Sequence, residues 1–430
     1  MEQEMISDSN VVDGESDTSK VQKGELMTTN MNQTPSANRT HIGIFGKRNA
    51  GKSSLINAIT GQNYAIVSDV LGTTTDPVLK SMELLPLGPV VIIDTPGLDD
   101  EGELGALRIQ KAYQILNKTD IAVLVIDASS GITKEDSEIL KRIHEKEIPC
   151  VIVVNKSDIC PNCNLEDLQL PDSDSAILVS SKTGEHIHEL KELLAQQSSQ
   201  DTIQKSIVAD LLKPLDFVVL VVPIDSAAPK GRLILPQQQT IRDILEAKAS
   251  AIVVQETELA ETLNSLGKKP KMVITDSQVF KKVSAVTPDD ILLTSFSILF
   301  ARYKGNLKTL VNGASALDSL KNGDRILISE GCTHHRQCDD IGTVKLPNWI
   351  RSYTKKEVEF EFTSGTEFPL DLSSYKMIVH CGGCMLNERE MKYRLKCAED
   401  AKIPITNYGT CIAYINGILN RSLEPVKDFL

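Results

Sequence analysis

A short segment near the start of the chain places two glycines, a lysine and a serine at a characteristic spacing. It runs Gly46-Lys47-Arg48-Asn49-Ala50-Gly51-Lys52-Ser53 and matches the pattern G-x-x-x-x-G-K-[ST]. An apolar run, His41 to Gly46, precedes it, and a helical pattern, Ser53–Thr60, follows it. A loop of this kind between a strand and a helix turns its backbone N–H groups inward around phosphates. The segment therefore predicts a nucleotide-binding α/β domain.

Apolar runs alternate with helical patterns through the first 200 residues. The expected strands are His41–Gly46, Val90–Asp94, Ile121–Asp127, Val151–Asn155 and Ala176–Val179, and the expected helices are Ser53–Thr60, Leu104–Asn117 and Lys134–Glu147. Continuous apolar runs suit parallel strands that are covered on both faces. The predicted fold class is therefore α/β with a doubly wound, mostly parallel sheet, whose ligands bind beyond the carboxyl ends of the strands.

Three further motifs follow in order, each at the end of a predicted strand. They are Asp94-Thr95-Pro96-Gly97, Asn155-Lys156-Ser157-Asp158 and Ser180-Ser181-Lys182. The Asp94 carboxylate can hold Mg²⁺ through water, and the Gly97 N–H can meet a γ-phosphate. The Asp158 carboxylate can accept both N–H groups of guanine, which adenine does not offer. The set predicts GTP, with Mg²⁺, as the ligand.

The four motifs resemble those of the translation-factor-like GTPases, and Gly72-Thr73-Thr74-Thr75-Asp76 resembles the first switch of the Era, Der and MnmE branch. By that resemblance, Thr74 senses Mg²⁺ and the γ-phosphate, and Asn49 holds a K⁺ ion that stimulates slow hydrolysis. Leu98 stands where Ras-type enzymes have a water-positioning glutamine. Lys52, Thr74 and Asn49 are the catalytic candidates, with Ser53 and Thr74 as Mg²⁺ ligands. The expected nucleotide site comprises Gly46, Asn49, Ala50, Gly51, Lys52, Ser53, Ser54, Thr74, Asp94, Gly97, Asn155, Lys156, Asp158, Ser181 and Lys182.

Composition narrows the classes of partner. The formal net charge is −12 and aromatic residues make up 4% of the 430 residues, which disfavours nucleic acid and anionic membranes as partners. No apolar run is long enough to span a bilayer, and the N-terminus lacks a secretory pattern. Nine cysteines without a secretory context indicate free or metal-bound thiols in a cytoplasmic protein.

Cysteines and histidines gather in two places near the C-terminus. Cys332-Thr333-His334 and His380-Cys381-Gly382-Gly383-Cys384 each follow a predicted strand, and they can meet if those strands are neighbours. Three readings remain open from the residues alone: free thiols, a tetrahedral zinc site, or an iron–sulfur cluster with three thiolates and a variable fourth ligand. Either histidine could be that ligand or could support one.

A GTPase domain followed by an α/β region and by C-x-H…H-C-x-x-C resembles the HydF family of FeFe-hydrogenase maturation GTPases over residues 41–430. The resemblance implies that Cys332, Cys381 and Cys384 ligate a 4Fe–4S cluster, with His334 or His380 as a possible fourth ligand. It also implies a scaffold or carrier that receives a transient dinuclear iron precursor made with radical-SAM maturases and delivers it to the apo-FeFe-hydrogenase. A homodimer would form through the middle domain.

The expected organisation has three folded domains. A disordered tail, 1–40, precedes a P-loop GTPase domain, 41–200, an α/β dimerisation domain, 201–300, and an α/β cluster-binding domain, 301–430. The expected strands of the last two are Phe217–Val222, Ala251–Val254, Met272–Ile274, Arg325–Ser329, Val358–Phe362 and Lys376–His380. Alternative functions are a ribosome-assembly or tRNA-modification GTPase with a structural metal site, and a plain redox protein. A second Cys-x-x-Cys pair, Cys160 and Cys163, has no partner pair and no expected role beyond weak zinc binding or redox sensitivity.

Overall fold

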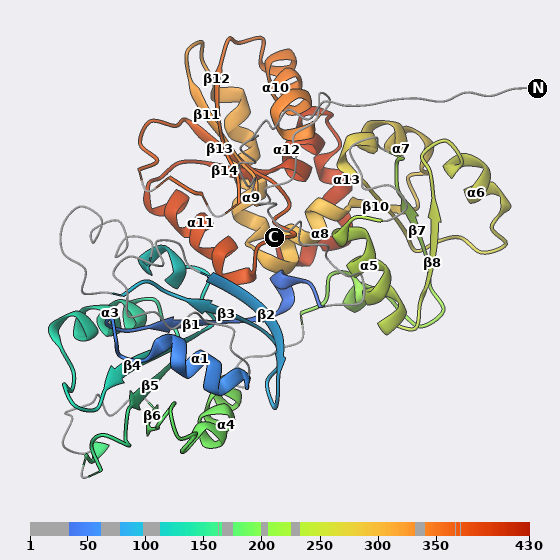
Figure 1. The fold of residues 1–430 in the computed structure, drawn as a ribbon. Coiled ribbons are helices and arrows are strands. Elements are labelled where there is room, and N and C mark those ends of the chain that lie inside the picture. The colour runs from blue at the N-terminus through green and yellow to red at the C-terminus, as the bar shows by residue number, and fades with distance from the viewer. Residues whose placement is uncertain are drawn as a thin grey trace, which may run out of the picture. The chain divides into compact units, whose positions relative to one another are not determined.

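The computed structural model describes residues 34–61, 78–97, 112–161, 163–165, 175–198, 205–224, 233–331, 340–365, 367–369 and 371–430. Residues Pro35–Leu430 form one compact unit. Three separate β-sheets, each flanked by helices, follow one another along this unit (Figure 1). No helix in the described part of the chain is long and apolar enough to cross a membrane.

The first sheet carries the nucleotide motifs. Its strands are β1 (Thr40–Phe45), β2 (Val78–Leu84), β3 (Gly88–Asp94), β4 (Ile121–Asp127), β5 (Cys150–Asn155) and β6 (Ser175–Leu178), in the spatial order β2-β3-β1-β4-β5-β6. Only β2 is antiparallel to its neighbour; the other pairs are parallel. This is the mostly parallel, doubly wound sheet that the alternating sequence predicts.

Helices cover both faces of this sheet. Helices α1 (Lys52–Thr60) and α4 (Ile187–Ser198) pack on one face, where Leu55 and Leu190 are buried with alternate strand residues. Helix α3 (Lys134–Glu145) packs on the other face through Ile139 and Ile143. Because both faces are buried, the central strands are apolar throughout, as β4 is from Ile121 to Ile126.

The second sheet is entirely parallel. Its strands are β7 (Phe217–Val221), β8 (Ser250–Val254), β9 (Met272–Thr275) and β10 (Leu292–Ser295), in the order β10-β9-β7-β8. The helices of this region are α5 (Leu235–Glu246), α6 (Leu259–Ser265), α7 (Phe280–Val286) and α8 (Phe296–Lys304). Strand β10 leads directly into α8, whose first turn is capped by the Ser295 hydroxyl.

The third sheet is also parallel. Its strands are β11 (Arg325–Ser329), β12 (Glu359–Thr363), β13 (Met377–His380) and β14 (Ile405–Asn407), in the order β12-β11-β13-β14. Its helices are α9 (Leu307–Ala314), α10 (Leu346–Thr354), α11 (Glu388–Asp400), α12 (Tyr408–Ile415) and α13 (Leu419–Leu423). Short 3-10 turns occupy Ser36–Asn38, Ala209–Leu211, Ser277–Val279, Ser315–Ser319 and Glu424–Phe429, and Ile341–Lys345 is π-helical.

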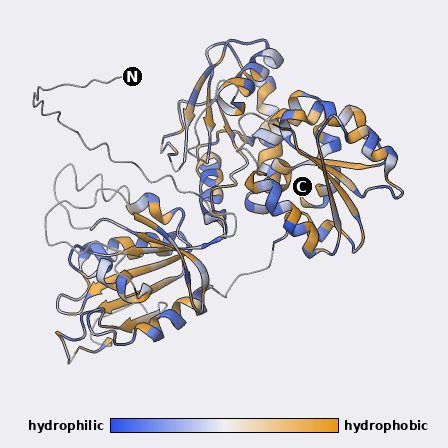
Figure 2. Cartoon of the chain, turned by 45° about the vertical axis from the view of Figure 1, so that its right-hand side comes forward, coloured by the Kyte–Doolittle hydropathy of each residue, from blue (hydrophilic) through white to orange (hydrophobic). Residues whose placement is uncertain are grey.

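The second and third sheets share one hydrophobic core. A single cluster of buried residues includes Val218 and Met272 from the second sheet, Phe300 from α8, and Leu327 and Ile378 from the third sheet. Figure 2 shows the strands of the sheets as mainly hydrophobic and the helices as divided between hydrophobic and hydrophilic faces. Burial of these faces is the main favourable term that holds the sheets and helices together.

Candidate nucleotide and cluster sites

Glycines shape the loop between β1 and α1. Gly46 has φ +141°, and a Cβ atom there would lie 2.3 Å from the Val125 carbonyl oxygen. Gly51 has φ +93°, and a Cβ atom there would lie 2.2 Å from Nδ2 of Asn155. Both positions therefore require glycine, for backbone conformation and for space. Asn49, at φ +61°, lies exposed in the same loop.

Lys52 and Ser53 begin α1, and their side chains contact the phosphate loop and Asp94, where a phosphate and Mg²⁺ would bind. Lys52 is buried, and its Nζ donates to the carbonyls of Gly46 (2.8 Å) and Lys47 (2.7 Å). The Ser53 hydroxyl donates to Oδ2 of Asp94 at 3.2 Å. Burial raises the pKa of Asp94 against the opposing charge of Lys52, and Oδ1 of Asp94 is buried without a hydrogen-bond partner among the described residues. A hydroxyl beside a carboxylate with an unused oxygen fits a Mg²⁺ ion.

Asn155 joins three of the sequence motifs. Its side chain is fully buried; Nδ2 donates to the Ala50 carbonyl at 3.0 Å, and Oδ1 accepts from the Ser181 N–H at 3.0 Å. Oδ1 of Asp158 accepts the Ser180 hydroxyl at 2.8 Å, and Lys182 Nζ lies 3.9 Å from Oδ2 of Asp158. The phosphate loop and both base-recognition segments thus meet at the carboxyl edge of the first sheet.

Lys156 has a partner that the motif pattern does not predict. Its Nζ donates to Oδ2 of Asp127 at 2.6 Å, and its backbone has φ +72°. Asp127 ends β4 next to Asn155, which ends β5. A carboxylate at the end of an apolar run was the available signal for this contact. Ser54 and Gly97 are half-buried at α1 and after β3, and Thr74 lies outside the described residues.

The third sheet places side by side the two strands that precede the cysteine-bearing segments. Strands β11 and β13 are parallel neighbours, with Ser329 opposite His380, as their predicted meeting requires. The Gly331 N–H donates to Sγ of Cys381 at 3.0 Å, and the Gly383 N–H lies 3.4 Å from the same sulfur. Gly331 immediately precedes Cys332, which lies outside the described residues together with His334.

The Cys381–Cys384 turn is suited to hold a metal centre by its sulfur atoms. Both thiols are free and half-buried. Burial raises the pKa of Cys381 to about 11 and also raises that of Cys384, while the N–H groups of Gly331 and Gly383 directed at Sγ of Cys381 favour its thiolate. A metal ion binds the thiolate and so displaces the proton. Gly383 has φ +63°, and a Cβ atom there would lie 2.5 Å from Sδ of Met391. Among the described residues, no group of three or more His, Cys, Asp or Glu side chains is placed to hold a metal ion. Two thiols of the expected three are therefore placed by the described chain.

His380 is engaged at both ring nitrogens. Nδ1 lies 2.7 Å from the Cys381 carbonyl, and Nε2 lies 3.0 Å from a guanidinium nitrogen of Arg394. Because a guanidinium only donates, Nε2 accepts and Nδ1 carries the proton. Burial, reinforced by the charge of Arg394, lowers the pKa of His380 to about 3. Arg394 also bonds Glu390, Ser329 and the Gly365 carbonyl, so this buried network supports the strand end that bears Cys381.

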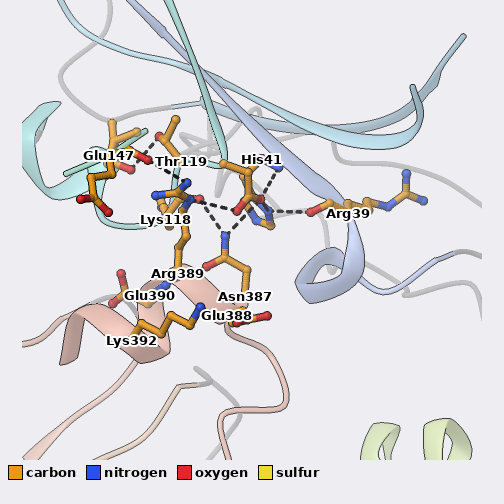
Figure 3. A network of polar contacts seen from close by, with 12 residues as sticks. Arg39, His41, Lys118, Thr119, Glu147, Asn387, Glu388, Arg389, Glu390 and Lys392 are labelled. Atoms are coloured by element: carbon orange, nitrogen blue, oxygen red, sulfur yellow. Dashed lines mark hydrogen bonds and ion pairs between the residues drawn. The ribbon is translucent and has the colours of Figure 1, made fainter. Parts of the chain in front are cut away.

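A second polar network surrounds the start of α11 (Figure 3). The Asn387 side chain caps α11 by accepting from the Glu390 N–H at 3.1 Å, and its Nδ2 donates to the Lys118 carbonyl at 2.8 Å. Asp120 accepts the His41 N–H at 2.8 Å, and its carboxylate lies 3.6 Å from Nε of Arg389. Directly after the Asn155–Asp158 motif, Cys160 and Cys163 are joined as a disulfide. The expectation that every cysteine is free or metal-bound was therefore wrong for this pair.

Family models match most of the chain beyond its first 40 residues. Residues 308–425 match the hydrogen maturase F tetramerization domain, and residues 207–305 match the hydrogen maturase F dimerization domain. Residues 41–156 match the model described as 50S ribosome-binding GTPase. The two hydrogen maturase F models together cover half of the chain and account for the second and third sheets.

Curated relatives match the first sheet. The tRNA modification GTPase MnmE of Nitrosomonas eutropha is 36% identical over 152 residues, 35% of this chain and 33% of that protein. GTPase Der of Prochlorococcus marinus subsp. pastoris is 33% identical over 192 residues, 40% of this chain and 41% of that protein. The chain thus spans a third to two fifths of the length of these relatives. A solved structure of Era from Aquifex aeolicus with GDP and aluminium fluoride is 20% identical, with a TM-score of 0.33, over 53% of this chain and 98% of that one.

The order of the three matches along the chain is that of a GTPase domain, a dimerisation domain and a tetramerisation domain. The two later domains are specific to one family, whereas the GTPase domain is shared with MnmE and Der. The chain belongs to the hydrogen maturase F (HydF) family.

Proposed function

We propose that this protein is a GTP-hydrolysing scaffold or carrier in FeFe-hydrogenase maturation. It receives the dinuclear iron precursor of the hydrogenase active site and delivers it to the apo-hydrogenase. The observation that carries the proposal is the Cys381–Cys384 turn, held beside Gly331 at one edge of the third sheet in a chain with both HydF-specific domains.

The chain's own residues supply what GTP hydrolysis requires. Lys52 is placed to exchange its loop carbonyls for phosphate oxygens, which an ammonium group favours strongly. Ser53 and Asp94 offer the oxygens for Mg²⁺, with Thr74 as the second expected ligand. Asp158 selects guanine, while Asn155 holds the loops around the base and phosphates together.

Potassium is proposed as the activating ion. Asn49 lies exposed beside the phosphate loop, where a side-chain oxygen could hold a monovalent cation near the phosphates. Such a charge would stabilise negative charge that develops in the transition state. Hydrolysis should therefore be faster in KCl than in NaCl at equal ionic strength, and Asn49→Ala should remove the difference. Equal rates of the unaltered protein in the two salts would contradict this role.

The cluster site is proposed to consist of Cys332, Cys381 and Cys384. When bound, a 4Fe–4S cluster held by three thiolates offers one iron position that an exchangeable ligand can fill. His334 is the preferred candidate for that position, because His380 would first have to give up a hydrogen bond to Cys381 or Arg394. Gly331 and Gly383 direct N–H groups at sulfur, and His380 holds the Cys381 carbonyl.

Self-association and delivery complete the proposal. Residues 207–305 match the dimerization domain and are expected to form a homodimer. Residues 308–425 match the tetramerization domain and are expected to join dimers into tetramers. Radical-SAM maturases and the apo-FeFe-hydrogenase are the expected partners, in the cytoplasm. Neither nucleic acid nor membrane is expected as a partner, given the net charge of −12.

Oxygen-free purification tests the cluster and its delivery in two steps. We expect about four irons and four sulfides per chain and a paramagnetic signal after reduction. Protein loaded by the maturases should then activate apo-hydrogenase. Cys384→Ser protein should neither bind the cluster nor activate apo-hydrogenase. A zinc protein that cannot be reconstituted with iron and sulfide would refute the proposal.

A tRNA-modification or ribosome-assembly GTPase is the second candidate. It is favoured by the 36% identity to MnmE, although this covers 35% of the chain. The discriminating measurement is RNA binding at physiological salt. Tight, salt-dependent binding of tRNA or ribosomal RNA by a colourless zinc protein would favour this alternative over the carrier.

A further inference from the structure

A buried lysine lies beneath the Cys381–Cys384 turn. Lys304 is the last residue of α8 and is only 3% exposed. Its Nζ lies 3.4 Å from the Gly383 carbonyl oxygen, 3.1 Å from that of Cys384 and 2.8 Å from that of Leu386. One side chain from the helix before the third sheet thus contacts three backbone carbonyls around a predicted cluster ligand.

The number of contacts matches the chemistry of a charged ammonium group. An ammonium has three N–H donors and no acceptor, and three carbonyls of a single turn receive them. Turning carbonyls toward a cation leaves the turn's N–H groups free to face the other side, as the Gly383 N–H does toward Sγ of Cys381. The same turn therefore offers oxygens to Lys304 and N–H groups to sulfur.

The lysine stem is fixed by its surroundings. Leu299, Phe300 and Ala301 of α8 lie in the core shared by the second and third sheets, and Nζ lies 5.8 Å from the centre of the Phe300 ring. Gly305 follows the helix as its C-cap, and a Cβ atom there would lie 3.0 Å from the Ala301 carbonyl oxygen. Since the side chain is anchored in a close-packed core, the charge cannot move away from the turn without repacking it.

A buried positive charge has a defined effect on an anionic centre nearby. Three thiolates and a 4Fe–4S core carry net negative charge, and reduction adds one more. Charges interact strongly at short distance when protein rather than water lies between them. A fixed cation behind Cys384 therefore stabilises the reduced form more than the oxidised form.

We propose that Lys304 is a positioning residue of the cluster site: it fixes the Gly383–Leu386 backbone through three carbonyls and makes the bound cluster easier to reduce. This inference rests on the proposed cluster at Cys332, Cys381 and Cys384. It assigns a function to the end of the dimerisation domain, because Lys304 lies in the segment 207–305 that this domain covers. The cluster would thus be completed by two domains of one chain.

The test compares full-length Lys304→Met with the unaltered protein after anaerobic reconstitution. The cluster is titrated with dithionite, which supplies the one electron, and followed by paramagnetic resonance. We expect the midpoint potential of Lys304→Met to be at least 59 mV more negative than that of the unaltered protein. This shift corresponds to a tenfold lower ratio of reduced to oxidised cluster at a fixed potential. In the metal-free protein, we expect faster amide hydrogen exchange within Gly383–Leu386, because the turn has lost its support. Lys304→Arg should have a midpoint potential close to that of the unaltered protein, since arginine keeps the positive charge.

Controls separate this inference from the function on which it rests. Lys396→Met removes a lysine whose side chain is 69% exposed on α11 and should leave the midpoint potential and the hydrogen exchange of the turn unchanged. Lys304→Gln, which keeps N–H donors but no charge, replaces the methionine variant if that protein does not fold. An unaltered protein that binds no iron–sulfur cluster would refute the proposed function itself. A cluster present in all variants with one common midpoint potential and one rate of amide hydrogen exchange in the turn would refute only the role of Lys304.

Discussion

At the scale of single residues, the nucleotide site depends on side chains that touch backbone from distant parts of the chain. Asn155 bonds the Ala50 carbonyl and the Ser181 N–H, so one amide connects segments that are 26 and 105 positions from it. The motif spacing predicted that these segments belong to one site. It did not predict this contact, because the motifs specify ligand contacts and not the bonds among the loops.

Gly51 is the first place where this arrangement can be tested. Alanine there would suffer both the left-handed backbone, at φ +93°, and a Cβ atom 2.2 Å from Nδ2 of Asn155. Gly61, at φ +67°, has open space around the same position and is the matched control. We expect Gly61→Ala to lower the free energy of unfolding by about 1 kcal/mol and to keep GTP binding. Gly51→Ala should cost more and lose GTP binding, as measured by denaturant unfolding and fluorescent-nucleotide titration; equal effects would contradict the steric argument.

Asp158 is the second residue at which the nucleotide site can be tested. Guanine offers two N–H donors to this carboxylate, and Asp158→Asn would replace one acceptor with a donor. Losing charge-assisted hydrogen bonds of about 1.5–3 kcal/mol each should weaken GTP binding by about 100-fold. Xanthosine triphosphate, with a carbonyl in place of the amino group, should then bind better than GTP. The Ser180 hydroxyl can still donate to the asparagine oxygen, so the loop should persist. Unchanged preference for GTP in a competition titration would exclude Asp158 from base recognition.

At the scale of helices and strands, local sequence predicted the long apolar elements well and the short ones poorly. Strands β4 (Ile121–Asp127) and β11 (Arg325–Ser329) have the predicted bounds. Strand β2 was not predicted, because this edge strand is largely exposed and has no continuous apolar run. Strands β10 and β14 are short and lead directly into helices at Ser295 and Asn407, so their apolar residues merge with the helical pattern. The expected helix Leu104–Asn117 lies largely outside the described residues.

The cluster site was also only partly predictable at this scale. The pairing of β11 with β13, which brings Gly331 to Cys381, could be stated as a condition from the sequence and is confirmed in the sheet. Lys304 carried no local signal, because the carbonyls that it contacts are 79 to 82 positions away. Burial of a lysine is a property of the assembled sheets and helices, and no periodicity within α8 indicates it.

Helix α11 provides a prediction at the scale of an element. Arg394 is fully buried and bonds Glu390, His380 and Ser329. Removing one member of a buried ion pair leaves the other charge uncompensated, so Arg394→Met should cost about 3–5 kcal/mol of unfolding free energy. Lys396→Met, on the exposed side of the same helix, should change it by less than about 0.5 kcal/mol. Denaturant unfolding measures both, and similar small losses would show that the network contributes little.

At the scale of the whole molecule, the nucleotide motifs and the cysteine turn belong to different sheets. The former occupy the carboxyl edge of the first sheet and the latter that of the third. No residue of the proposed GTP site is also a proposed cluster ligand. Each chemistry should therefore survive the loss of the other, and any coupling must pass through changes in the arrangement or partners of the domains.

Paired variants test this independence. Cys381→Ser should abolish iron and sulfide binding and leave the GTP hydrolysis rate within about twofold, since the substitution is outside the first sheet. Lys52→Ala should abolish hydrolysis, because it removes the phosphate-binding ammonium, and leave iron content unchanged. Iron assays and phosphate release on the same preparations give both readouts. Loss of hydrolysis in folded Cys381→Ser protein would contradict the separation.

The core shared by the second and third sheets sets a limit on how this protein can be divided. Sequence families place a boundary between residues 305 and 308, yet Phe300 on one side and Leu327 and Ile378 on the other are buried in the same cluster. Expression of the two regions as separate fragments would expose hydrophobic surface on each, and each fragment would tend to aggregate. The limits of the two family models therefore do not coincide with a break in the hydrophobic core, and we expect the two regions to fold as one cooperative unit.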